Sequence, residues 1–169
     1  MKVKEVMTRD VKTCAPETDL ATAAESMWMR DCGVLPIVDK SGRVVGMITD
    51  RDICIAVGCR RRDPAMILVR EVMAEQVYSC SPEADVCEAL QIMKRKQVRR
   101  LPVIDSAGEL SGVISMNDIA LKIQPDAKAP EPGLRDIHAA LKSICAHRTT
   151  TGEATPEQLR AEGQEVAAK

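Results

Sequence analysis

The sequence predicts an α+β protein made of two similar β-α-β-β-α units followed by a helical tail. The first observation is an internal repeat: residues 3–57 align with residues 69–123 without a gap, and 19 of these 55 positions are identical. The second is that each copy alternates apolar helical faces with short apolar runs. A repeat of this length is a supersecondary unit, and two copies would pack to bury a face that one leaves open. We therefore expect one compact domain of two halves.

A short strand and an amphipathic helix begin the first copy. The strand is expected from Asp10 to Cys14, before Pro16, and Asp19 suits a helix N-cap. The residues that follow at i, i+3, i+4, i+7 and i+8 form one apolar helical face. Its members are Leu20, Ala23, Ala24, Met27 and Trp28, and those of the second copy are Val86, Ala89, Leu90 and Met93.

Two strands and a second helix complete each copy. In the first copy, the apolar run 34–38 is typical of a buried strand, residues 40–42 of a turn, and residues 43–48 of the next strand. Thr49 is expected to open a helix that extends to about Val57.

Three parts are expected along the chain: repeat 1 at residues 1–62, repeat 2 at 63–124, and a third part at 125–169. Residues 124–133 hold three prolines, which predicts an extended linker. The next segment predicts one amphipathic helix, with apolar residues at Leu134, Ile137, Leu141 and Ile144. This helix either binds a partner or second copy, or packs against its own domain. Residues 149–169 are polar and small, and we expect them to be mobile, with a short helix possible after Pro156.

Composition argues against membrane and nucleic-acid partners. No apolar run approaches the roughly 20 residues that span a bilayer, and no signal segment is visible, so a cytoplasmic location is expected. The net charge is −1, and one Trp, one Tyr and no Phe leave no platform for stacked bases. The basic clusters, at residues 60–62 and 94–100, are expected to be solvated faces.

Cysteine and histidine usage argues against a metal site and against catalysis. The seven cysteines form no C-x-x-C pair and are expected to be reduced thiols that pack as small apolar groups. Both histidines, His138 and His147, lie beyond the repeats, so a histidine-based metal site or a Ser-His relay within the repeats is excluded. The 45 residues after the repeats are too few and too polar for a catalytic fold. We expect no metal site, no catalytic residue and no enzyme activity.

One motif, Gly-h-Ile-[Thr/Ser]-x-x-Asp (h, apolar), occurs in both copies, at residues 46–52 and 112–118. It can be a capping box, in which the hydroxyl caps a helix and the acid bonds back to the N-cap amide. It can also bind a nucleotide, because a helix N-terminus favours an anion and the acid can accept both hydroxyls of a ribose. Both interpretations stay open.

Three motifs recur in order in both copies: [Thr/Ser]-x-x-Pro, Leu-Pro-h-h-Asp and the Gly-h-Ile motif. Together they resemble tandem CBS (cystathionine β-synthase) domains, a Bateman module, over about residues 1–124. The resemblance implies that the repeats pack through their sheets around a pseudo-two-fold axis. It also implies two clefts between the repeats for adenosine-type ligands, and dimers formed through helices.

Site residues follow from the resemblance. Asp52 and Asp118 would hold ribose, and Thr49 and Ser115 would meet phosphate. Five further residues would lie near the adenine, largely through their backbone: Thr13, Cys14, Tyr78, Ser79 and Cys80. Aliphatic side chains would have to sandwich the base.

The copies differ before the Leu-Pro pair, where Arg99 and Arg100 correspond to Gly33 and Val34. In the family that is resembled, a basic residue directly before Leu-Pro often reaches a ligand phosphate, which makes Arg100 the best candidate. The alternative is that both arginines belong to a solvated helix end. If Arg100 does bind phosphate, the two clefts are chemically unequal.

The expected function is a regulatory module that binds an adenine nucleotide (AMP, ADP or ATP) or a related adenosyl compound, with no required cofactor. The alternative is a structural or interaction protein with empty, degenerate clefts. A homodimer is expected because apolar helix residues, including Met27, Trp28 and Met93, exceed what one core needs. We also expect a protein target, whose identity the sequence does not indicate.

Overall fold

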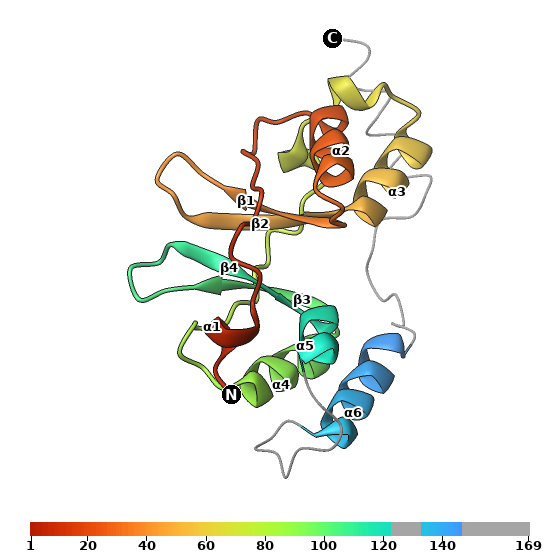
Figure 1. Cartoon of the computed structure of the whole chain (residues 1–169). Helices are drawn as coiled ribbons and strands as arrows, with labels where there is room; N and C mark the ends of the chain where they lie inside the picture. The colour runs from red at the N-terminus through yellow and green to blue at the C-terminus, as the bar shows by residue number, and fades with distance from the viewer. Residues whose placement is uncertain (123–132, 147–169) are drawn as a thin grey trace. The chain divides into compact units, whose positions relative to one another are not determined.

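Each repeat folds around a two-stranded antiparallel hairpin covered by helices, as the computed structural model shows for residues 1–122 and 133–146 (Figure 1). In the first repeat, β1 (Val34–Val38) pairs with β2 (Val44–Thr49). In the second, β3 (Arg100–Ile104) pairs with β4 (Leu110–Ser115). The mixed architecture confirms the predicted α+β class.

The expected first strand of each repeat is wrong, since a single bridge replaces it: Cys14 pairs with Ile37, and Cys80 pairs in the same way with Val103. Prolines explain why each ladder stops after one residue. Cys14 donates its N–H to the Pro36 carbonyl and accepts from Val38 N–H. To extend the ladder beyond Cys14, one hydrogen bond would need an N–H at Pro36 and the other an N–H at Pro16. Proline has no N–H, so the ladder ends on both sides.

The long helices begin where the sequence predicts them. They are α2 (Leu20–Met29), α3 (Asp50–Arg60), α4 (Val86–Lys96), α5 (Met116–Lys122) and α6 (Leu134–Cys145). Asp19 caps α2 by accepting from Thr22 N–H at 2.8 Å, which also keeps the pKa of this carboxyl below its usual value. Asp85, its counterpart, caps α4.

The buried faces of α2 and α4 differ. All four apolar residues predicted for α4 are buried, but on α2 only Leu20, Ala23 and Met27 are. Ala24 is exposed, and the side chain of Trp28 is 87% exposed, so these two do not belong to the core face. Met27 and Met93 are buried within their own repeats. Only Trp28 therefore remains of the three residues on which the expected dimer rests.

The repeats exchange their amino-terminal segments. One compact unit, the repeat-1 unit, consists of residues 12–76, and the other, the repeat-2 unit, consists of residues 1–11, 77–122 and 133–146. The short helix α1 (Val3–Val6) contributes Val3 and Val6 to the core of the repeat-2 unit. Two 3₁₀ turns, η1 (Pro64–Met66) and η2 (Val69–Glu71), form the amino-terminal segment of repeat 2 in sequence, and both belong to the repeat-1 unit.

Equivalent hydrogen bonds hold the two exchanged segments. Val3 N–H donates to Ala84 at 3.0 Å, and its counterpart Val69 donates to Thr18 at 2.7 Å. The compact units therefore do not follow the sequence boundaries at 62 and 63, because the apolar residues of each leading segment are buried with the other repeat.

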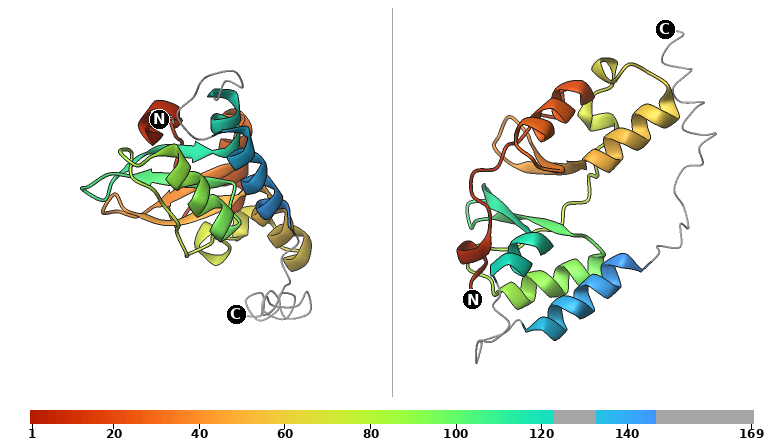
Figure 2. Two further views of the ribbon diagram at one scale, coloured as in Figure 1. Left: turned by 90° about the horizontal axis from the view of Figure 1, so that it is seen from below. Right: turned by 45° about the vertical axis from the view of Figure 1, so that its right-hand side comes forward.

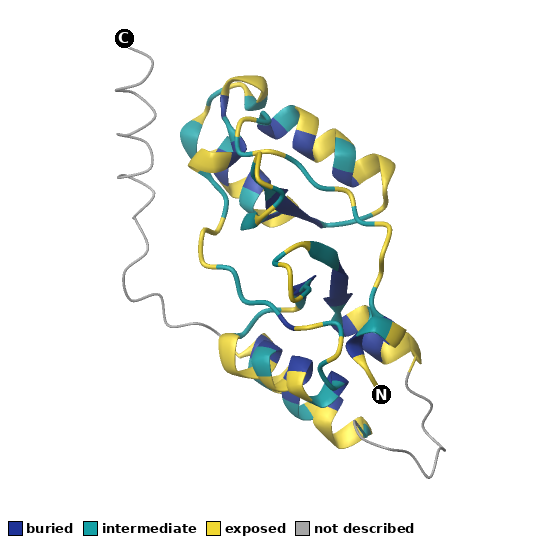
Figure 3. Cartoon of the chain, turned by 90° about the vertical axis from the view of Figure 1, so that its left-hand side faces the viewer, coloured by how far each residue is buried: buried dark blue, intermediate teal, exposed yellow. Residues whose placement is uncertain are grey.

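Helix α6 packs against α4 of its own unit, as the second of the two alternatives expects (Figure 2). Its buried residues are Ile137, Ala140 and Ile144. Leu134 and Leu141, which the sequence places on the same apolar face, are exposed instead. Figure 3 shows the same division along the helices of each unit, with buried residues on one side and exposed residues on the other. Most of the expected linker and the whole expected tail lie outside the described residues.

Both cores are aliphatic with buried methionines, Met27 in the repeat-1 unit and Met93 and Met116 in the repeat-2 unit, as the composition predicts. None of the helices described is long and apolar enough to cross a membrane.

Candidate functional site

Both Gly-h-Ile motifs form complete capping boxes. Asp52 accepts from the Thr49 N–H at 2.9 Å and from its hydroxyl at 2.7 Å, and its own N–H donates to the Thr49 hydroxyl at 3.2 Å. Ser115 and Asp118 repeat this arrangement, with the Ser115 N–H donating to the carboxylate at 2.8 Å. In both boxes the bonds from the hydroxyl residue go to the same carboxylate oxygen, Oδ2. The capping interpretation is confirmed. The bonds of the two boxes use only Oδ2, so Oδ1 of each acid takes no part in its cap.

The Oδ1 atoms of the two acids have different surroundings. Oδ1 of Asp118 accepts from the Thr8 hydroxyl at 3.2 Å. Within the residues that the structure describes, Oδ1 of Asp52 accepts no hydrogen bond. Sequence reasoning missed Thr8, because its role depends on the exchanged amino-terminal segment and no motif marks it.

Arg100 lies directly across the β3–β4 hairpin from Ser115. Residues opposite one another in an antiparallel pair point to the same face, so Arg100 is a neighbour of the Ser115–Asp118 box. The arginine is half-buried, and across the described ranges its side chain forms no ion pair or hydrogen bond. It is part of a strand, so the alternative of a solvated helix end does not apply to it. Its counterpart Val34, opposite Thr49, is buried and uncharged.

The segments expected near an adenine run beside β1 and β3. Cys14 and Cys80 bond to the neighbouring strand through backbone atoms only. Burial raises the pKa of both thiols to about 11, so they stay protonated at neutral pH. This supports packing, and not redox chemistry, as their role. Thr13 and Ser79, which precede them, are half-buried.

Tyr78 contacts the end of α4. The Lys96 ammonium lies 4.7 Å from the centroid of its ring, a cation–π contact. No hydrogen bond or ion pair within the described ranges joins Tyr78, Ser79 or Cys80 to Asp118. The structure thus brings Arg100, Ser115 and Asp118 together in the repeat-2 unit, and it aligns Cys80 with Val103 of β3, the strand that begins at Arg100.

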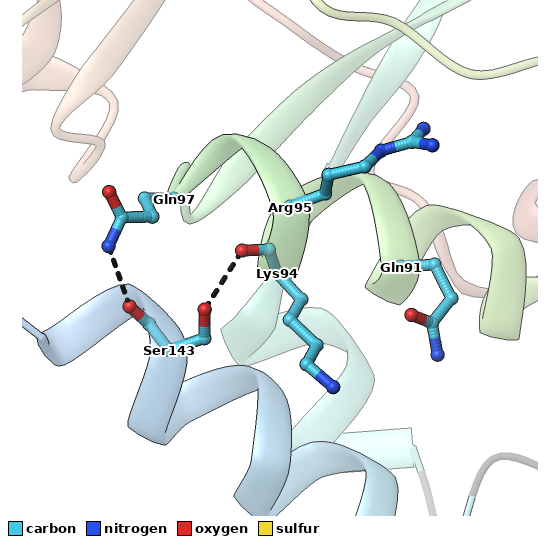
Figure 4. Close-up of a pocket in the computed structure, with 5 residues that line it drawn as sticks. All are labelled: Gln91, Lys94, Arg95, Gln97 and Ser143. Carbon is cyan, nitrogen blue, oxygen red and sulfur yellow. Dashed lines mark hydrogen bonds between the residues drawn. The ribbon is translucent and has the colours of Figure 1, made fainter.

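A pocket of about 460 Å³ lies between α4 and α6, and none of the predicted site residues lines it (Figure 4). Its lining residues are Gln91, Lys94, Arg95, Gln97 and Ser143. Ser143 ties the two helices together: its hydroxyl donates to the Lys94 carbonyl at 2.9 Å, and its carbonyl accepts from the Gln97 amide at 3.1 Å. The cations belong to the last turn of α4, where they offset the negative end of the helix dipole.

The described residues contain no group of three or more His, Cys, Asp or Glu side chains that could hold a metal ion.

Comparison with known proteins finds one domain type twice in the chain, in the same two segments as the internal repeat. The family profile of the CBS domain matches residues 3–58 and 69–124. Uncharacterized protein MK0525 of Methanopyrus kandleri is 34% identical over 125 residues, which are 74% of this chain and 63% of that protein. Hypoxic response protein 1 of Mycobacterium tuberculosis is 35% identical over 143 residues, which cover 85% of this chain and 93% of the relative.

Solved structures share the fold. The chain is similar to Hypoxic Response Protein I with two coordinated zinc ions, with a TM-score of 0.67 and 32% identity over 73% of this chain and all of that one. The CBS domain pair of protein MJ0100, in complex with 5-methylthioadenosine and S-adenosyl-L-methionine, has a TM-score of 0.66 at 24% identity, covering 72% and 94%. CBSX2 in complex with AMP has a TM-score of 0.63 at 20% identity, covering 71% and 93%.

The family profile covers both repeats, and hypoxic response protein 1 matches over most of both chains. This chain therefore belongs to the CBS domain family and carries two copies of the domain.

Proposed function

We propose that this chain is a regulatory module that binds adenosine-containing ligands. The observation that carries the proposal is Arg100, a half-buried arginine that has no anionic partner in the described structure and lies beside the Ser115–Asp118 box. A guanidinium in a partly buried position is stabilised by an anion, and its planar fork suits phosphate. The complexes of MJ0100 and CBSX2 with adenosyl compounds support this class of ligand.

The chemistry assigned to each group follows from what it can accept or donate. A carboxylate accepts hydrogen bonds and can take both hydroxyls of a ribose, which is the role proposed for Asp52 and Asp118. Thr49 and Ser115 would donate to phosphate once their hydroxyls leave the carboxylate oxygens that they contact here. No bond of the ligand is made or broken in this scheme. The module therefore acts by binding alone, and the presence of ligand in its sites affects a protein target.

The seven cysteines support a reducing compartment, the cytoplasm. All seven are described, and all are free thiols. A homodimer is also proposed, with a second copy covering the exposed apolar residues of α2.

Substitution of the two acids tests the proposal. Asp118→Ala and Asp52→Ala should each weaken binding of AMP by roughly ten- to a hundredfold at the affected site, because a hydrogen bond to a charged group contributes about 1.5–3 kcal/mol. Isothermal titration calorimetry measures this, and the melting temperature of each variant controls for folding. Unchanged binding in both variants would leave the boxes as helix caps only and support the alternative of empty clefts.

A further inference from the structure

The side chain at position 8, with its repeat counterpart at position 74, makes the two acids unequal toward a sugar. Thr8 and Ala74 occupy the same place in the two units. Thr8 exchanges backbone hydrogen bonds with Val113, both at 2.9 Å, and Ala74 exchanges them with Met47 at 2.9 and 3.1 Å. The backbones are therefore held alike, and the side chains differ by a hydroxyl and a methyl group.

A glycine in each motif allows this close approach. A Cβ atom added at Gly112 would lie 2.6 Å from the Thr8 carbonyl oxygen, and one added at Gly46 would lie 3.2 Å from that of Ala74. Each segment can therefore lie against its hairpin and bring position 8 or 74 toward the adjacent acid. In the repeat-2 unit the result is the bond from the Thr8 hydroxyl to Oδ1 of Asp118.

We propose that Thr8 is a specificity-determining residue that competes with a ribose for Asp118, whereas Ala74 leaves Asp52 open to it. The inference rests on the proposed function, since it assumes that these acids receive ribose hydroxyls. A vicinal diol needs acceptors for two donors, and Oδ2 of each acid already accepts two bonds from its own box. The remaining oxygen decides the outcome: among the described residues Oδ1 of Asp52 accepts no hydrogen bond, whereas Oδ1 of Asp118 already accepts one from Thr8.

Two consequences follow for ligand choice. A nucleoside without phosphate has only its sugar and base to offer, so it binds first in the repeat-1 unit, at Asp52. A phosphorylated ligand gains Arg100 in the repeat-2 unit and can displace the Thr8 hydroxyl there. Nucleosides would thus bind preferentially in the repeat-1 unit, and nucleotides in the repeat-2 unit.

Adenosine titrations on single-site backgrounds test the competition. In an Asp52→Ala background, Thr8→Val keeps the branched shape and removes the hydroxyl. It should tighten adenosine binding roughly tenfold, the lower end for a hydrogen bond to a charged group, because the Thr8–Asp118 bond is long at 3.2 Å. With 2′-deoxyadenosine, which lacks one of the two ribose hydroxyls, Thr8→Val should tighten binding less than it does with adenosine. In an Asp118→Ala background, Ala74→Thr should weaken adenosine binding more than Ala74→Val, which adds bulk without a hydroxyl.

The outcomes separate this inference from the proposed function. Adenosine binding that depends on the acids but does not respond to Thr8→Val overturns the role of Thr8 and leaves the proposed function standing. Equal effects of Ala74→Thr and Ala74→Val would likewise overturn it, because bulk and not the hydroxyl would then decide. If wild-type protein binds neither adenosine nor AMP, both proposals fail together. Melting temperatures of all variants exclude loss of folding as the cause.

Discussion

At the scale of single residues, Arg100 is the group whose surroundings say most about a ligand. It has no partner within the described structure, and Val34 replaces it in the other repeat. Arg100→Ala should therefore weaken AMP binding more than adenosine binding, and the difference should shrink as salt rises, because the contact is electrostatic and partly exposed. Calorimetry at two salt concentrations measures both effects. Equal losses for the two ligands would show that Arg100 supports the fold and not the phosphate.

The two equivalent cysteines give a prediction in pH. Burial raises the pKa of Cys14 and Cys80 from 9.0 to about 11 in the folded protein. The unfolded state therefore releases these protons first as the pH rises above 9, so the free energy of unfolding should fall between pH 9 and 11. At pH 8, iodoacetamide should modify exposed Cys54 and Cys145 well before Cys14 and Cys80. Equal labelling rates, followed by mass spectrometry of peptides, would contradict the burial argument.

At the scale of secondary-structure elements, the sequence predicts what local patterns determine and misses what tertiary contacts decide. The caps at Asp19 and Asp52 are local, and both form as predicted. The missing first strands depend on prolines in two paired segments, Pro16 and Pro36, whose combined effect appears only once the pairing is known. The exchanged segments depend on which core buries Val3 or Val69, and the repeat alone does not decide this because both repeats offer similar cores.

Helix α6 shows the same limit, since its apolar residues form more than one stripe. Ile137 is 7% exposed and Leu141 is 42% exposed. Ile137→Ala should lower the free energy of unfolding by about 2 kcal/mol, near the lower end for a large-to-small core change. Leu141→Ala, the matched control on the same helix, should change it by about 0.5 kcal/mol or less. Urea denaturation measures both, and equal effects would show that α6 is not docked on α4 through the Ile137 face.

At the scale of the whole molecule, the exposed apolar residues of α2 bear on assembly. Trp28 and Met29 are 87% and 72% exposed, and a large apolar pair on one helix end is typical of a surface that another protein covers. A second copy is the proposed occupant. Covering one such side chain contributes about 1.5–3 kcal/mol, and a symmetric dimer gains this twice. Light scattering at tens of micromolar should therefore show a homodimer.

Trp28 is also the only tryptophan, so its fluorescence reports directly on this surface. On dilution through the dissociation range, the emission should shift to the red as water reaches the indole. Trp28→Ser removes this burial from both copies and should weaken the dimer by roughly a hundredfold or more in dissociation constant. Leu134→Ser, at an exposed apolar residue of α6, serves as the matched control and should leave the dimer intact. A wild-type monomer at tens of micromolar, or a dimer that Trp28→Ser does not weaken, would show that a second copy does not cover α2.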